Sequence, residues 1–275
     1  MSIESVAFFA VIGRENTIMS MDRRTLSAEA VTAAFNQICA HLDEDAGELD
    51  AATRKRLERI AKESMEAHPA LAWQTLGMLA AERWDSEALE VAYANALRCE
   101  RGVQAGINCA VALAACNRFG EAAEVAERAW QAQPSSLLAL RGAIDMAWQA
   151  GRWARALELM QALSPRSNAT DRETEAYRRK AVAILERHAV PLSAVEALHD
   201  ALYGLLATRR VRALAACEFV DDGPGEETVY VTVQIAREHD EVAQLDEALA
   251  EALSDAVEAY PLAAFAIDLA ERETA

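Results

Sequence analysis

The 275-residue sequence has little glycine, little proline and few aromatic residues, with 11 glycines, 6 prolines and 6% aromatics. These low contents exclude a collagen-like or low-complexity chain, and the hydrophobic content of 52% excludes a wholly disordered one. Long apolar runs are also missing. The run from Val6 to Ile12 is too short to span a bilayer and follows Glu4 rather than basic residues, so we expect neither a membrane anchor nor a signal peptide.

Cysteine and the common catalytic motifs are scarce as well. The five cysteines are scattered and odd in number, which indicates reduced thiols in the cytoplasm, and no CxxC pair or histidine cluster predicts a metal site. The motifs GxxxxGK[ST], GxGxxG, HExxH and GxSxG do not occur. His199 and Asp200 with Glu196 could form an acid–base set, but adjacent helix residues point apart, which favours a solvated helix face. We therefore expect no catalytic residue, no cofactor and no enzymatic activity.

Positive charge is in short supply, because 27 Lys and Arg residues face 44 Asp and Glu residues, a net charge of −17. Such a chain repels phosphate backbones and anionic lipids, so we expect neither nucleic acid nor a membrane as a partner. Residues 218–275 hold 16 acidic residues and only two basic ones. A basic protein partner would be steered to this C-terminal segment.

An internal period of 34 residues begins after Pro69. Three equivalent triplets lie 34 residues apart, namely Glu87-Ala88-Leu89, Glu121-Ala122-Ala123 and Arg155-Ala156-Leu157. Each copy predicts two helices joined by a tight turn, over residues 70–82 with 86–98, 104–115 with 120–132, and 137–149 with 153–163.

The three copies, roughly residues 69–167, resemble degenerate tetratricopeptide repeats. That family has a small residue early in the second helix, an aromatic residue before it and a closing proline, matched here by Ala88, Ala122 and Ala156, by Phe119 and Trp153, and by Pro134. Only a small side chain fits where the two helices cross most closely. The resemblance implies an array of two-helix repeats whose first helices line a groove. A non-repeating helical bundle is the alternative.

Side chains on the first helices are candidates for partner binding, namely Trp73, Gln74, Asn108, Arg141, Asp145, Trp148 and Gln149. A tryptophan in a groove is a typical interface anchor, although packing of Trp73 and Trp148 between repeats is an equal alternative. Some tetratricopeptide domains bind a C-terminal carboxylate through basic and asparagine side chains. Asn108 could fill one such position, but Leu138 and Gly142 stand where basic residues would be needed, so this ligand is not expected.

Helices are also expected on both sides of the repeats. Ser27 predicts the N-cap of a first amphipathic helix reaching Leu42, and a second helix ends near Pro69. A helix over about residues 173–188 is expected to close the stack, and Pro191 indicates a domain boundary near 189–192. The expected parts are an N-terminal extension or strand at 1–26, a helical repeat domain at 27–190 and an acidic α/β module at 191–275.

The C-terminal module alternates helix and strand patterns. The strongest strand signal is the period of two over residues 228–235, with a partner strand over 214–220, a helix over 242–257 and a last strand over 265–269. With a helix near residues 195–206, the order is αββαβ, one leading strand short of a ferredoxin-like βαββαβ sandwich. The run from Val6 to Ile12 could supply that strand.

Acidic residues form a stripe on the last predicted helix, at Glu247, Glu251, Asp255 and Glu258. Like charges at this spacing destabilise a helix by about 0.2–0.5 kcal/mol per pair, and a basic partner would relieve the repulsion. A solubilising surface without a partner is the alternative.

These patterns predict a mainly α protein, a tetratricopeptide-like helical repeat array followed by a small C-terminal α/β module. We expect a non-enzymatic adaptor or chaperone-like scaffold that binds a protein partner through the helical groove and the acidic module. The alternative function is that of an immunity protein or antitoxin that neutralises a basic toxin or nuclease by covering its active cleft.

Overall fold

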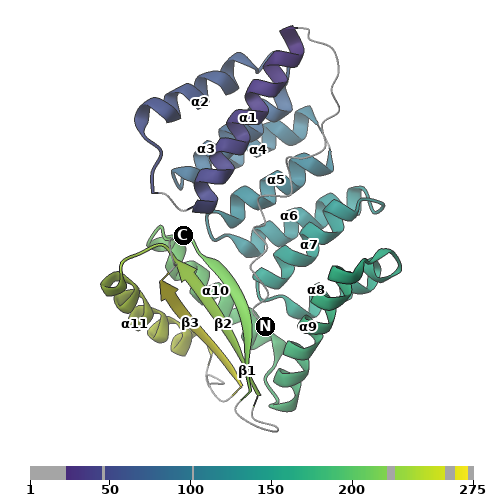
Figure 1. Cartoon of the computed structure of the whole chain (residues 1–275), viewed down its shortest axis with the longest axis vertical. Helices are drawn as coiled ribbons and strands as arrows, with labels where there is room; N and C mark the ends of the chain where they lie inside the picture. The colour runs from purple at the N-terminus through teal and green to yellow at the C-terminus, as the bar shows by residue number, and fades with distance from the viewer. Residues whose placement is uncertain (1–22, 45–46, 101, 222–226, 258–263, 272–275) are drawn as a thin grey trace. The chain divides into compact units, whose positions relative to one another are not determined.

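The structure, a computed structural model, describes residues 23–44, 47–100, 102–221, 227–257 and 264–271 (Figure 1). The chain divides into two compact units, one ending at Cys116 and the other beginning at Asn117. We refer to them as the N-terminal unit and the C-terminal unit. This division falls at a different point from the boundaries expected near residues 26 and 190.

The N-terminal unit consists of helices in its described part, namely α1 (Arg23–Glu44), α2 (Ala51–Glu63), α3 (Pro69–Glu82), α4 (Ser86–Cys99) and α5 (Val103–Ala114). Helix α3 packs against α1, α2, α4 and α5, so it is the central element of this unit (Figure 1). The expectation that Ser27 is an N-cap is wrong, because α1 already begins at Arg23. Arg and Leu are good helix formers, and they extend the helix by a turn.

The C-terminal unit contains further helices and a small sheet. Its helices are α6 (Phe119–Ala132), α7 (Leu137–Gln149), α8 (Trp153–Leu163), the short 3₁₀ helix η2 (Ser164–Arg166), α9 (Ala169–Arg187), α10 (Leu192–Thr208) and α11 (His239–Ala256). Its strands are β1 (Leu214–Asp221), β2 (Glu227–Ile235) and β3 (Phe265–Glu271). The chain is therefore mainly helical with a small C-terminal sheet, and the predicted αββαβ order from α10 to β3 is confirmed.

Short polar side chains determine where several helices begin. Asp50 accepts hydrogen bonds from the backbone N–H groups of Ala52 and Thr53, both at 2.9 Å, at the start of α2. At the start of α9, Asn168 and Asp171 form a reciprocal capping box. Each cap satisfies backbone donors that have no partner inside the helix, which typically stabilises the helix by about 1 kcal/mol.

The turns between helices repeat along the chain. Left-handed residues occur at Trp84, Asn117 and Gly151, with φ of 59°, 56° and 72°, so they lie 33 and 34 residues apart. The turns at Trp84 and Gly151 each contain an equivalent hydrogen bond of 2.9 Å. In the first, the N–H of Asp85 donates to the carbonyl of Ala80, and in the second, the N–H of Arg152 donates to the carbonyl of Ala147. This repetition of one turn geometry agrees with the 34-residue period of the sequence.

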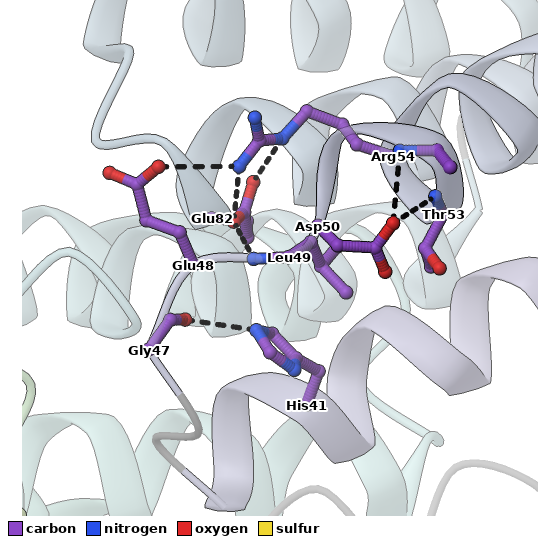
Figure 2. Close-up of polar contacts among 9 residues, drawn as sticks. His41, Gly47, Glu48, Leu49, Asp50, Thr53, Arg54 and Glu82 are labelled. Atoms are coloured by element: carbon purple, nitrogen blue, oxygen red, sulfur yellow. Dashed lines mark hydrogen bonds and ion pairs between the residues drawn. The ribbon is translucent and has the colours of Figure 1, made fainter.

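A buried ion pair joins three segments of the N-terminal unit, as Figure 2 shows. The fully buried side chain of Glu82 at the end of α3 accepts two hydrogen bonds from Arg54 of α2, at 3.0 and 3.1 Å. It also accepts a hydrogen bond of 2.8 Å from the backbone N–H of Leu49. Charge-assisted bonds of this kind are stronger than neutral ones, so they hold the loop before α2 against α3.

The sheet has the order β1-β2-β3. Strands β1 and β2 are antiparallel, β2 and β3 are parallel with Val231 opposite Ile267, and α11 connects β2 to β3. Valines and isoleucines that alternate along β2 are buried, and α11 packs against α10 and β3 (Figure 1). Because β2 and β3 are hydrogen-bonded neighbours, no strand can lie between them as the split ferredoxin-like arrangement requires. The run from Val6 to Ile12 lies outside the described residues.

An aromatic cluster forms the core of the C-terminal unit. The Trp153 ring lies 5.9 Å from the His199 ring and 5.7 Å from the Phe265 ring, between centroids. A Cβ atom at Gly151 would lie 2.8 Å from the His199 ring. Helices α8 and α10 and strand β3 therefore share one core, and the turn before α8 requires glycine both for its positive φ and for this close approach.

The packing of α3 on α4 supports a first prediction. A Cβ atom at Gly77 would lie 2.5 Å from Cε2 of Tyr93, whose side chain is only 1% exposed. We expect Gly77→Ala to lower the free energy of unfolding by about 1–3 kcal/mol in urea denaturation, because the core is overpacked. Gly204→Ala on α10 is the matched control, since its Cβ would meet no atom within 4 Å, and we expect no loss of stability there. Equal stability of the two variants would contradict this account.

Candidate partner-binding surfaces

Two of the three groove residues predicted in the N-terminal unit, Gln74 and Asn108, contact each other. Asn108 donates a hydrogen bond of 2.6 Å from Nδ2 to Oε1 of Gln74, and its Oδ1 accepts one of 2.9 Å from Gln104. Gln74 and Asn108 are buried, whereas Trp73 is partly exposed. Residues 34 positions apart thus meet across α3 and α5, as stacked equivalent helices require. Of the three predicted residues, Trp73 keeps the most surface for a partner.

The predicted residues Arg141 and Asp145 of α7 form ion pairs with α9. Arg141 donates two hydrogen bonds to Asp171, at 3.1 and 2.8 Å, and Arg178 donates one of 2.8 Å to Asp145. The bond from Arg141 is the main reason that the pKa of Asp171 is lowered. Asp171 and Arg178 were not predicted as site residues. Their spacings of 30 and 33 residues from their partners, close to the period, are the signal that could have identified them.

Trp148 lies inside the packed structure, with 7% of its surface exposed. Its ring stacks on Trp153 at 4.2 Å between centroids, and the Arg178 guanidinium lies over it at 5.1 Å. The hydroxyl of Tyr203 donates a hydrogen bond of 3.4 Å to Gln149. Trp148 is therefore packed between helices, which was the alternative to its prediction as an exposed interface anchor.

The acidic stripe lies on the outer face of α11. Glu247, Glu251 and Asp255 are exposed, while Val242, Leu245, Leu249 and Leu253 on the opposite face are buried. In the part of the chain that the structure describes, these three carboxylates form no ion pair with Lys, Arg or His. Glu258 lies outside the described residues.

Carboxylates on other elements are often paired. Glu127 binds Arg155, and Glu227 binds Lys180 at 2.8 Å and Arg187 at 3.3 Å. On α11 itself, Glu241 lies 3.8 Å from Arg237. On β3, burial and then the negative charge of Asp246 raise the pKa of Asp268, and residues 218–275 hold 16 acidic residues against two basic ones. The local field around α11 and β3 is therefore negative, which favours a cationic group at this surface.

His199 and Asp200 point in different directions, as adjacent helix residues must. The expectation of a solvated face is wrong for His199, which is 2% exposed and whose Nδ1 lies 2.8 Å from the Val195 carbonyl oxygen. Burial lowers the pKa of His199 to about 4. The apolar side chains at i−4, i−1 and i+3 (Val195, Leu198 and Leu202) continue the buried stripe of α10, so helical spacing could have placed His199 in the core.

Thiols, metal ligands and membrane spans are the remaining candidate features of the described residues. Cys39, Cys109 and Cys116 are buried as expected, whereas Cys99 is exposed. Within the described ranges, no three His, Cys, Asp or Glu side chains are grouped so that they could hold a metal ion. None of the described helices combines the length and the apolar content needed to cross a membrane.

Comparisons with known proteins add no relative. No protein-family model, no curated protein and no solved structure matches the chain.

The buried histidine makes stability depend on pH. Its folded pKa of about 4 is below the ordinary 6.5, so the unfolded chain binds the proton more readily. The contribution to stability is present above about pH 6.5 and is lost as pH falls towards 4, by up to roughly 3 kcal/mol. Urea unfolding of His199→Gln and of the parent over this range tests the effect.

We expect His199→Gln to show a weaker loss of stability on acidification than the parent. His239→Gln, which replaces an exposed histidine at the start of α11, is the matched control and should keep the parental pH dependence. Identical acid slopes for the parent and His199→Gln would refute the assignment.

Proposed function

We propose that this protein is a non-enzymatic protein-interaction module, an adaptor or chaperone-like scaffold. It binds a protein partner of basic character through the acidic stripe of α11. The face of α3 that carries Trp73, here called the first-helix face, is a second contact surface. The observation that carries the proposal is the row of exposed carboxylates at Glu247, Glu251 and Asp255, which form no ion pair with any described Lys, Arg or His. The chain itself gains no stability from a row of like charges at helical spacing, whereas a cationic partner would remove the repulsion.

The helical part is proposed to be a tetratricopeptide-like array that serves as the scaffold. The contact between Gln74 and Asn108 and the left-handed turns at Trp84, Asn117 and Gly151 support a repeating two-helix unit. The small residues Ala122 and Ala156 are fully buried, as the close helix crossing of such repeats requires. A scaffold of this kind presents an extended surface to another protein.

The second candidate function is inhibition, in which the protein acts as an immunity protein or antitoxin against a basic toxin or nuclease. The excess of acidic residues over residues 218–275, 16 against two basic ones, favours it, because an inhibitor of a cationic cleft must supply complementary negative charge. Both candidates bind a protein, but they differ in what the bound partner can still do.

The first test reverses charge on α11. A variant carrying Glu247→Lys, Glu251→Lys and Asp255→Lys should associate with the partner at least tenfold more slowly at low salt, because electrostatic steering is reversed. The partner is first captured from lysate of the native host at low and high salt and identified by mass spectrometry. Association rates are then measured with purified components over a series of salt concentrations.

The control for the charge reversal is a variant with three exposed acids replaced outside α11, Glu66→Lys, Glu173→Lys and Glu186→Lys, which changes the net charge equally. We expect this control to slow association far less than the α11 variant. Equal slowing by both, or association that does not depend on salt, would overturn the proposed role of the stripe. Loss of the partner's enzymatic activity on binding would select inhibition over the adaptor function.

The second test addresses the first-helix face. Trp73→Ala should weaken partner binding about tenfold with moderate salt dependence, because a partly exposed tryptophan is a typical interface anchor. Val91→Ala on α4, where the valine is 53% exposed, is the matched apolar control and should bind as the parent does. If Trp73→Ala binds normally, the first-helix face is not a contact surface.

A further inference from the structure

The N-terminal part of α9 is held on α7 but adds no residue to the buried core. We call residues 169–178 the α9 cover. None of these ten residues is buried, whereas the following turns of the helix bury Ala181, Val182, Ile184 and Leu185. Segments with little buried surface open locally at a lower free energy than the core does. The α9 cover is therefore expected to open while the rest of α9 stays packed.

Two ion pairs hold the α9 cover to α7. Asp171 accepts two hydrogen bonds from Arg141, and Arg178 donates one of 2.8 Å to Asp145. The side chains of Arg141 and Asp145 on α7 remain 39% and 35% exposed, so water and salt reach both pairs. Ion pairs that water reaches contribute little to stability. They can therefore be exchanged for equivalent pairs with another chain.

A tryptophan ring lies beneath the arginine of the α9 cover. One face of Trp148 stacks on Trp153, at 4.2 Å between centroids and with an angle of 5° between the rings. The Arg178 guanidinium lies 5.1 Å from the centroid of the same ring, so it takes the other face. Opening of the cover exposes this face beside Arg141 and Asp145, because the three α7 residues are spaced i, i+4 and i+7. Tryptophan and arginine are the side chains that most often dominate binding at interfaces.

The closed arrangement leaves one donor of the α9 cover unsatisfied. Nη2 of Arg178 binds Asp145, but its Nη1 is buried and donates no hydrogen bond in the described structure. A buried donor without an acceptor costs free energy, so the resident contact is weaker than a fully paired one. A competing helix whose arginine has both terminal nitrogens paired avoids this cost.

The same contacts define the chemistry of a helix that replaces the α9 cover. Arg141 donates from Nε and Nη2 to the two oxygens of one carboxylate, which calls for an aspartate or a glutamate. Arg178 pairs with Asp145 while it lies over Trp148, and a planar guanidinium does both better than the compact ammonium of lysine. Asp171 and Arg178 are seven residues apart, so they lie on one helix face. The matching ligand is a helix with an acidic residue and an arginine at this spacing.

We propose that the α9 cover is displaceable, and that the face of α7 beneath it binds a partner helix carrying an acidic residue and, seven residues later, an arginine. The cover is then an autoinhibitory contact, because it occupies the surface that the partner helix needs. The proposal goes beyond the proposed function, since it concerns α7 rather than the acidic stripe of α11. Either can fail without the other.

The first test follows amide hydrogen exchange of the full chain by mass spectrometry. We expect the amides of residues 173–178 to exchange at least tenfold faster than those of residues 182–187, because the α9 cover opens by itself. Arg178→Ala should speed exchange in the cover about tenfold more, since it removes both the ion pair and the contact with the ring. Arg179→Ala is the matched control and should change this exchange far less, because Arg179 pairs with Glu175 of its own helix.

The second test uses a fluorescently labelled peptide with the sequence of residues 167–180, which contains the α9 cover and its N-cap. In fluorescence anisotropy, we expect the Arg178→Ala chain to bind it with a dissociation constant on the order of 1 mM, at least tenfold more tightly than the parent, whose resident cover competes. Asp145→Asn in the Arg178→Ala chain should weaken binding about tenfold, because the acceptor for the arginine of the peptide loses its charge. A peptide carrying Asp171→Arg and Arg178→Asp has the same composition and should not bind.

Equal exchange in the two parts of α9 would overturn the proposal, and the parent chain decides this point even where Arg178→Ala does not fold. Failure of the peptide to bind the Arg178→Ala chain, equal binding of the charge-exchanged peptide, or unchanged binding after Asp145→Asn would overturn it as well. Peptide binding together with a failed charge reversal on α11 would overturn the proposed function and leave this surface intact. The opposite pattern would overturn this inference alone.

Discussion

Close approach of helices at small residues is the constraint on which the packing of this chain depends. Gly77 admits the ring of Tyr93, Gly151 admits the ring of His199, and alanines line the buried faces of both units. Large rings therefore pack directly against the backbone, and a single methyl group added at Gly77 would overpack the core and lower the stability of the fold. In this alanine-rich chain with few aromatic residues, the rings of Tyr93, Trp153 and Phe265 are thereby almost completely buried.

The same close packing determines what the surface offers to a partner. Where helices approach one another, their polar side chains pair, as Gln74 of α3 does with Asn108 of α5 and Arg141 of α7 with Asp171 of α9. As long as these groups form hydrogen bonds inside the protein, they contribute less to the recognition of a partner. Among the described residues, Glu247, Glu251 and Asp255 on the outer face of α11 form no ion pair with Lys, Arg or His, so these three carboxylates remain available. Charge rather than shape is then the main source of partner selectivity in the proposed function.

Much of the fold could be predicted because helix and strand periods are local. One face of α10 is buried as helical spacing predicts, at Val195, Leu198, Leu202 and Leu206. The alternating pattern of β2 likewise predicted which of its side chains are buried. The acidic stripe could be predicted for the same reason. The contact between the Phe119 ring of α6 and the Tyr203 ring of α10 could not, because these helices are distant in sequence and meet only through long-range packing.

By itself, the sequence determined the order of helices and strands, the 34-residue spacing of equivalent turns and the exposure of the charged stripe, since each follows from contacts within a few residues. Only the tertiary structure decided that His199 is buried against Trp153 and Phe265, that β2 and β3 are direct neighbours, and that the chain divides after Cys116. Trp153, His199 and Phe265 lie far apart in the sequence. Their contact depends on long-range packing, and a local period carries no information about such packing.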